Sequence, residues 1–197
     1  MKLPEQYYLS NDVVRLARDL IGKYLFTRID GLVSGGYIVE TEAYNGIVDK
    51  ASHAYGNRQT PRTSTMFAQG GIAYVYLCYG MLNVVTSVEG QPHAVLIRAI
   101  NPTIGLDVMQ ARRNMAVIKP NITMGPGSVA KALGINRKIN AISLQSDTLW
   151  IEDQGVTFPD EAITAAPRVG VDYAGDDALL PYRFYVKGNP YVSKPRS

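Results

Sequence analysis

Acidic and aromatic side chains alternate in the segment VETEAY, residues 39–44 of the chain. If this segment is a strand, its period of two places Ile38, Glu40, Glu42 and Tyr44 on one face. A carboxylate near a strand end, beside an aromatic ring and facing a loop, could act as a general base toward water. The same alternation is typical of a solvated sheet face whose charges discourage pairing with another strand. The pattern alone favours the solvated face and leaves both interpretations open.

Residues 45–71 form a polar, turn-rich segment, and loops of this length are usually functional or disordered. The segment contains His53, Arg58 and Arg62. The only other histidine is His93, so the chain lacks the i, i+4 pair of a helical zinc site. We therefore expect no metal site. His53 is either an exposed loop residue, which is the commoner case, or part of a ligand pocket.

Tyrosine is unusually abundant, with 13 tyrosines against 4 phenylalanines and 1 tryptophan. Because a buried tyrosine hydroxyl needs a hydrogen-bond partner, the excess indicates either a surface that stacks on flat ligands or half-buried sheet positions. Tyr74 and Tyr76 share one strand face, and Tyr79 precedes Gly80 at a turn. Aromatic side chains on a hairpin tip can stack on nucleic-acid bases or wedge between them. Core packing and an ordinary turn position are the alternative.

One glycine-rich segment, residues 125–130, matches the dinucleotide-binding pattern G-x-G-x-x-A. That site requires a strand directly before the glycines and a parallel strand pair around them. Pro120 lies just upstream and the sequence shows no parallel pair, so we do not expect a dinucleotide site. A helix that starts here could still contact a phosphate with its free N–H groups.

Hydrophobic periodicity indicates the elements that would position these residues. An apolar stripe over residues 13–21, capped by Ser10 or Asn11 and ended by Gly22, predicts the first helix. Further helices are predicted for residues 102–115 and 128–133, and strands for residues 23–29, 36–44, 72–79, 82–88, 94–100, 149–152 and 183–186. Clustered strands with scattered helices favour an α+β fold over a doubly wound sheet. We expect a single domain over residues 1–197.

Composition excludes several classes of protein. The chain has 197 residues, 46% of them hydrophobic and 19% charged, which is ordinary for a globular domain and excludes a disordered chain. Cys78 is the only cysteine, so a disulfide scaffold is excluded and a reducing compartment is expected. No apolar run is long enough to span a bilayer, and we expect neither a secretory signal nor a membrane partner.

Several motifs occur together in one order, and their combination resembles a known family. They are VETEAY, a downstream histidine, GNRQTPR, MF (Met66-Phe67), YVYLCYGM, NVVT, AVLIRA, GPG followed by ALGI, PRVGV and YRFYVKGNPYVS. The set resembles the alkyladenine (3-methyladenine) DNA glycosylases that lack a helix-hairpin-helix motif, over nearly the whole chain. The resemblance implies one α+β domain around a curved antiparallel sheet with flanking helices, from which a tyrosine-bearing hairpin projects into the DNA minor groove.

The resemblance also implies roles for individual residues. Glu42 matches the carboxylate that activates the attacking water, and Arg98 matches an arginine near that water. Tyr44, His53 and Tyr76 match the residues that sandwich the flipped base. Asn83 matches an asparagine that crowds the amino group of normal guanine. Tyr79 matches the wedge that fills the gap left by the extruded base. For contacts to the DNA backbone we expect Arg58, Arg62 and Lys131. The chain departs from the family pattern at the short Gly80–Asn83 connection and at Ser128, where a lysine is usual.

The activity implied by the resemblance is that of a monofunctional DNA glycosylase of base excision repair. Such an enzyme flips an alkylated or deaminated purine out of duplex DNA and hydrolyses its N-glycosidic bond, which leaves an abasic site. The resemblance implies no metal and no cofactor, damaged double-stranded DNA as partner, and a monomer in the bacterial cytoplasm or a eukaryotic nucleus. The alternatives are a non-enzymatic nucleic-acid binding module with stacking tyrosines and a small-molecule hydrolase. Release of a free base from alkylated DNA distinguishes a glycosylase from the binding module. Salt-sensitive DNA binding argues against the small-molecule hydrolase.

Overall fold

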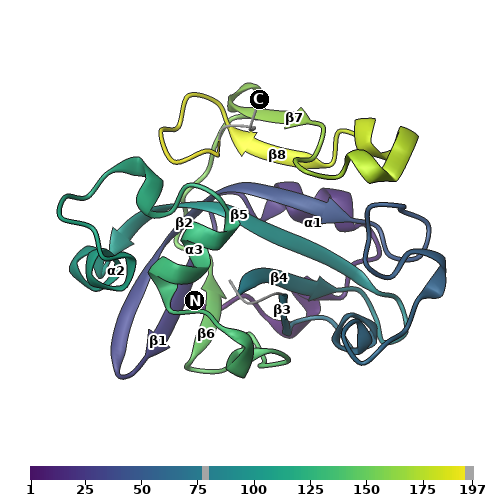
Figure 1. Cartoon of the computed structure of the whole chain (residues 1–197), viewed down its shortest axis with the longest axis horizontal. Coiled ribbons are helices and arrows are strands. Elements are labelled where there is room, and N and C mark those ends of the chain that lie inside the picture. The colour runs from purple at the N-terminus through teal and green to yellow at the C-terminus, as the bar shows by residue number, and fades with distance from the viewer. Residues whose placement is uncertain (77–79, 194–197) are drawn as a thin grey trace.

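The strands of this protein form one antiparallel sheet (Figure 1). The structure is a computed structural model that describes residues 1–76 and 80–193. The strand order in the sheet is β3-β4-β5-β2-β1-β6, and β8 pairs with both β2 and β7. The strands are β1 (Tyr24–Ile29), β2 (Leu32–Tyr44), β3 (Ala73–Tyr76), β4 (Met81–Thr86), β5 (His93–Ile104), β6 (Leu149–Glu152), β7 (Ile163–Ala166) and β8 (Arg183–Val186). The α-helices are α1 (Val13–Asp19), α2 (Leu106–Arg113) and α3 (Pro126–Leu133). The α+β prediction is confirmed.

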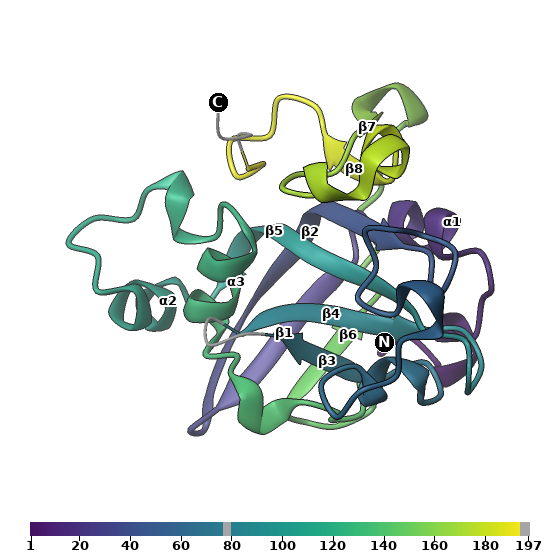
Figure 2. The ribbon, with the colours of Figure 1, turned by 45° about the vertical axis from the view of Figure 1, so that its right-hand side comes forward.

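Strand β2 is the centre of the sheet because it changes neighbours along its length. Its first half, Leu32–Tyr37, pairs with β1, whereas Glu40–Glu42 pair with β8. On the opposite side β5 follows β2 from Gly35 to Tyr44, with register shifts between Ile38 and Thr41. Figure 1 and Figure 2 show β2 and β5 as the two long strands that cross the molecule. Glu40 and Glu42 therefore lie inside the sheet rather than at an edge.

Helix α1 covers one face of β2. Its N-cap is Asp12, whose carboxylate accepts a hydrogen bond from the Arg15 amide at 2.9 Å, so the prediction of Ser10 or Asn11 as the cap was wrong by one or two positions. The Thr41 hydroxyl donates to the Ala17 carbonyl at 2.7 Å and ties the strand to this helix. Because side chains alternate along β2, Glu40 and Glu42 point to the face that α1 does not cover.

The largest error of the sequence prediction concerns residues 102–105, which were assigned to a helix. Pro102 and Ile104 continue β5 and pair with Gly36 and Gly35, and the helix begins only at Leu106. Gly105, with φ of 67°, turns the chain between the two elements. The short β7 was not predicted because its four residues are partly exposed and lack a strand-like apolar pattern.

Short 3₁₀ helices fill much of the connecting chain. They span Glu5–Tyr8, Tyr55–Asn57, Ser64–Phe67, Pro120–Ile122, Arg137–Ile139, Asp160–Ala162 and Asp172–Leu179. Two of them organise the long polar segment between β2 and β3, where Ala51, Ala54 and Met66 are buried. This segment is therefore an ordered wall beside the sheet. No helix in the described part of the chain is long and apolar enough to cross a membrane.

The glycine-rich segment 125–130 does not form a dinucleotide site, as predicted. Gly125 precedes α3, and the strand pairs in the described residues are all antiparallel. Helices α2 and α3 lie together at one end of the sheet (Figure 1). The N-terminus of α3 faces the same side of the molecule as the carboxylates of β2, because Pro126 and Arg98 line one cavity.

Gly36 lies where β2 and β5 approach each other closely, and Gly127 in α3 provides a control. A Cβ on Gly36 would lie 2.1 Å from the Asn101 carbonyl oxygen, whereas a Cβ on Gly127 would meet nothing within 4 Å. We expect Gly36→Ala to lower the free energy of unfolding by about 1–3 kcal/mol through overpacking. Gly127→Ala, the matched control in α3, should be neutral or stabilising by up to about 1 kcal/mol. Urea titration measures both, and equal stability of the two variants would contradict the close approach.

Candidate active site

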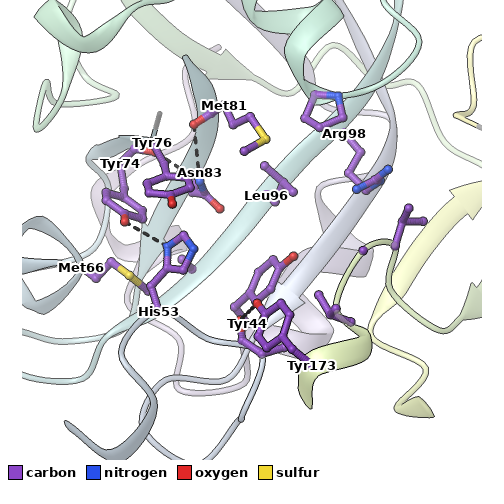
Figure 3. A pocket seen from close by; sticks show the side chains of 16 residues that line it. Tyr44, His53, Met66, Tyr74, Tyr76, Met81, Asn83, Leu96, Arg98 and Tyr173 are labelled. Atoms are coloured by element: carbon purple, nitrogen blue, oxygen red, sulfur yellow. Dashed lines mark hydrogen bonds between the residues drawn. The ribbon is translucent and has the colours of Figure 1, made fainter. Parts of the chain in front are cut away.

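A cavity of about 180 Å³ opens over the face of the sheet that α1 leaves free (Figure 3). Its volume is below the roughly 300–1,000 Å³ of pockets for drug-sized ligands, so it suits one flat ring system. Residues of β2, β3, β4 and β5, the long polar segment, the start of α3, and the 3₁₀ helix Asp172–Leu179 with the loop before it line the cavity. They are Tyr44, Ala51, His53, Met66, Tyr74, Tyr76, Met81, Asn83, Ala94, Leu96, Arg98, Pro126, Val169, Gly170, Val171 and Tyr173.

One wall of the cavity is built from three rings. The His53 and Tyr76 ring centroids lie 4.3 Å apart, and Tyr74 and Tyr76 lie 6.2 Å apart. His53 Nδ1 hydrogen-bonds the Tyr74 hydroxyl at 3.1 Å, which fixes the imidazole against the strand. The Arg62 guanidinium stacks 4.0 Å from the centre of the Tyr76 ring. Tyr44 and Tyr173 face this wall from the other side of the cavity (Figure 3).

Glu42 lies behind the cavity wall and is fully buried. Its Oε1 accepts from the Val169 amide at 2.7 Å and lies 3.1 Å from Arg98 Nη1. Its Oε2 accepts from the Tyr44 hydroxyl at 2.8 Å, and the residues described here supply no second partner to that oxygen. A carboxylate oxygen can accept at least two hydrogen bonds, so Oε2 can also bind a water. Tyr44, Arg98 and Val169, which touch Glu42, all line the cavity.

Glu40, the other acidic residue of VETEAY, is also fully buried and belongs to the same charged cluster. Its Oε1 lies 2.9 Å from Arg98 Nε and 2.7 Å from Arg183 Nε. The interpretation of this strand face as solvated, which the pattern alone favoured, was wrong. Strand β8 pairs beside β2, and the side chains of Arg183, Arg98 and Ser193 enclose Glu40. These groups come from segments far apart in the sequence.

The loop that supplies the Val169 amide is fixed by an ion pair on its neighbour Arg168. Arg168 is buried and paired with Asp49, with Nη2 and Oδ1 2.9 Å apart. Its Nη1 also donates to the Ala43 carbonyl at 2.9 Å, which ties the loop to β2. The guanidinium lies 5.0 Å from the centre of the Tyr44 ring, so one side chain supports both Tyr44 and the loop.

Ionisation of the ring residues follows from burial. Burial, with a smaller contribution from the Arg62 guanidinium, lowers the pKa of His53 from 6.5 to about 4. His53 is therefore neutral at neutral pH and adds no positive charge to the cavity. Burial and the adjacent Glu42 carboxylate raise the pKa of Tyr44 well above 10, so its phenol keeps the proton that it donates to Glu42.

The other predicted site residues fall into three groups. Asn83 is buried in the cavity wall, where its amide nitrogen lies 3.4 Å from the Tyr74 carbonyl. Arg58 and Arg62 line a neighbouring cleft of about 580 Å³, and Lys131 lines a third of about 710 Å³ beside the α3 N-terminus. Tyr79, the predicted wedge, lies outside the described residues.

Sequence reasoning missed several residues of the site. Met66, Val169 and Tyr173 line the cavity, and Arg168 holds the loop in place. Met66 and the PRVGV segment matched the family motifs, but nothing local indicates which groups of a loop reach a distant strand. Tyr173 carries no signal, because an exposed tyrosine in a polar segment looks like any surface residue. Among the described residues, no group of three or more His, Cys, Asp or Glu side chains could hold a metal ion.

The open antiparallel sheet carries a small aromatic cavity with a buried carboxylate beneath it. A protein with this site can hold a flat ring system next to a carboxylate that accepts a proton. The sequence comparisons identify the family. The family model described as methylpurine-DNA glycosylase (MPG) matches residues 7–190, and the chain belongs to that family.

Individual relatives match along almost the whole chain. A protein of Bacillus cereus (strain G9842), named "Putative 3-methyladenine DNA glycosylase", is 45% identical and covers 98% of this chain and 100% of its own length. Proteins with the same name from Bacillus thuringiensis (strain Al Hakam) and Chlamydia felis (strain Fe/C-56) are 44% and 46% identical. The latter covers 92% of this chain and 94% of its own length.

The environment of His53 predicts an acidic titration. We expect the His53 ring protons to titrate near pH 4 in an NMR experiment, and His93→Gln separates its signals from those of His93, whose pKa burial also lowers. Because the folded pKa lies below the unfolded value of about 6.5, the neutral ring contributes stability above pH 6.5. That contribution is lost as the pH falls toward 4. A His53 midpoint between pH 6 and 7 would show that the ring is solvated.

Proposed function

We propose that this protein is a monofunctional DNA glycosylase that removes alkylated purines from duplex DNA. The observation that carries the proposal is the fully buried Glu42, held behind an aromatic cavity by Arg98, Tyr44 and the Val169 amide. Family membership supports the reaction class, and the names of the relatives support 3-methyladenine as one substrate. A base in a duplex cannot reach such a cavity, so the nucleotide must be extruded first.

Hydrolysis then needs one water and one base. In the proposed step a water bound to Glu42 Oε2 attacks C1′ of the extruded nucleotide and gives its proton to that carboxylate. The N-glycosidic bond breaks, and its electron pair leaves with the purine, whose alkylation already makes it a good leaving group. The products are the free base and an abasic site. The Val169 amide and Arg98 hold Oε1, so Glu42 cannot turn away from the water.

The cavity favours damaged purines for an electrostatic reason. The faces of Tyr44 and Tyr76 are electron-rich, and a methylated purine that carries positive charge is attracted to them. Neutral His53 completes the sandwich without repelling that charge. Asn83 in the wall would crowd the amino group of normal guanine, and we assign it that role. Tyr79 remains our candidate for the wedge in the DNA.

The surface beside the cavity supports duplex DNA as the substrate. Exposed Lys50, Arg58 and Arg62 line the 580 Å³ cleft that shares His53 and Tyr76 with the cavity, and the residues that line it include no carboxylate. On the other side, Lys131 and the α3 N-terminus line the third cleft. Cations and helix N-termini on both sides of a base pocket suit the phosphates that flank an extruded nucleotide.

The remaining parts of the proposal concern how the chain works as a whole. The site residues come from one sheet and its connecting segments, which supports residues 1–197 as one domain that acts as a monomer. The proposed hydrolysis uses protein side chains and water, without a metal or cofactor. Its substrate would place the enzyme with genomic DNA, in the cytoplasm of a bacterium or the nucleus of a eukaryote.

The role of Glu42 is tested by an isosteric substitution. Glu42→Gln keeps the shape of the side chain but cannot take a proton, so base release should fall by about 10²–10⁴-fold. Single-turnover release of 3-methyladenine from alkylated duplex DNA measures this, and binding to the same DNA should stay within about threefold of wild type. Tyr44→Phe keeps the ring and removes one hydrogen bond to Glu42, so its loss should be smaller. Undiminished base release by Glu42→Gln would contradict the proposal.

The contribution of the basic cleft is tested by salt dependence. We expect Lys50→Gln and Arg58→Gln each to reduce the slope of log K against log salt by up to about 0.9, the value for one lost phosphate contact. Arg28→Gln is the matched control, because Arg28 is exposed and stacks on Trp150 instead. An unchanged slope in both cleft variants would place the DNA elsewhere.

A further inference from the structure

Glu40, the first glutamate of the VETEAY segment, has more hydrogen bonds than Glu42. Glu40 Oε1 accepts from Arg98 Nε at 2.9 Å, Arg183 Nε at 2.7 Å and the Ser193 hydroxyl at 2.7 Å. Its Oε2 accepts from the Ser193 amide at 2.7 Å. Glu40 is fully buried, and of its three partners only Arg98 lines the cavity, whereas all the partners of Glu42 do. Glu40 can therefore act on a bound ligand only through Arg98.

Arg98 is the neighbour that connects Glu40 to the site. Each nitrogen of its guanidinium has a different partner: Nε donates to Glu40, Nη1 lies 3.1 Å from Glu42 Oε1, and Nη2 donates to the Ser193 hydroxyl at 3.1 Å. Each of the three nitrogens is thereby engaged by one partner, which fixes the orientation of the guanidinium plane. Figure 3 shows Arg98 reaching from β5 along the edge of the cavity.

We propose that Glu40 is a positioning residue for base excision: it engages Arg98 so that the guanidinium contacts only one oxygen of Glu42. Ser193 locks this arrangement by bonding to both partners. The inference rests on the proposed function, because it concerns the carboxylate that would activate the water.

The geometry of arginine explains why such a restraint is needed. A guanidinium beside a free carboxylate tends to form two parallel hydrogen bonds, one to each oxygen. That pairing would occupy Glu42 Oε2, which is the oxygen left for water. With Nε held by Glu40 and Nη2 by Ser193, Arg98 approaches Glu42 through Nη1, which lies 3.1 Å from Oε1. Arg98 donates no hydrogen bond to Oε2, whose donor is the Tyr44 hydroxyl.

Charge balance shows how the cluster can be buried. Arg98 and Arg183 neutralise Glu40 and Glu42, and the Arg183 fork also donates to the Ser193 carbonyl at 2.9 Å. Buried ion pairs are tolerated only when the remaining donors and acceptors are also satisfied. Glu40 meets that condition with four hydrogen bonds, so its position is rigidly determined.

A double-mutant cycle tests the proposal. We expect Glu40→Gln to lower single-turnover release of 3-methyladenine by about 10-fold or more, the scale of effect that a small misplacement of a reacting group has. Binding of the damaged duplex should change less than about threefold. In an Arg98→Met background, Glu40→Gln should cost less than about threefold in base release, because Glu40 acts through Arg98.

Two further variants separate positioning from stability. Ser193→Ala removes one hydroxyl and should lower base release by roughly two- to tenfold while the protein stays folded. Thr27→Val is the stability control, because the buried Thr27 hydroxyl donates to the Leu133 carbonyl at 2.7 Å in a part of the core that does not line the cavity. Its melting temperature should fall as in Ser193→Ala, but its base release should match wild type.

The outcomes distinguish this inference from the proposed function. Equal losses from Glu40→Gln in the wild-type and Arg98→Met backgrounds would overturn the positioning role. So would wild-type base release by both Glu40→Gln and Ser193→Ala. Wild-type base release by Glu42→Gln, or none by the unmodified protein, would instead overturn the proposed function.

Discussion

Arg98 bonds to two carboxylates that are fully buried in the protein, and the surrounding strands must supply the donors that stabilise those charges. An isolated buried carboxylate is costly, so each oxygen needs hydrogen bonds from fixed donors. β5 supplies Arg98, β8 supplies Arg183, and the loop after β7 supplies the Val169 amide. The change of neighbour along β2, from β1 to β8, is what brings these donors together. The strand pairing at the centre of the sheet therefore determines which donors hold Glu42, and with them its chemistry.

The cavity above this cluster is different in character, because its rings are neutral. Burial keeps the His53 ring unprotonated and the Tyr44 phenol protonated at neutral pH. Glu40 and Glu42 lie behind the wall, Arg98 reaches the edge of the cavity, and the wall itself presents π faces. A cationic ring system can stack on these faces without meeting a protonated imidazole, because His53 is neutral. The neutral wall and the charged layer beneath it suit recognition and hydrolysis respectively.

The exposed cations form a third part of the site, distinct from the buried cluster and from the cavity, because they lie in the clefts on either side of the cavity. Lys50 and Arg58 come from the long polar segment between β2 and β3, and Lys131 comes from α3. Because exposed cations act through solvent, their contribution to DNA binding depends on salt, whereas the buried cluster is shielded from it. The molecule thus combines a salt-sensitive outer surface with a rigid interior site.

The sequence by itself determined the α+β class and the strands Leu149–Glu152 and Arg183–Val186. Local periodicity is enough for these elements because it depends on neighbouring residues. That Tyr44, His53 and Tyr76 share one cavity was implied by the family resemblance of the motifs, not by periodicity. The burial of Glu40 and Glu42 was not predictable in this way, since alternation defines the faces of a strand but not what covers each face. Only the tertiary structure decided that Arg98 from β5, Arg183 from β8 and the Val169 amide enclose them. These groups are remote in the chain, so no local pattern encodes their approach, and the chain entropy lost in bringing them together is offset by packing.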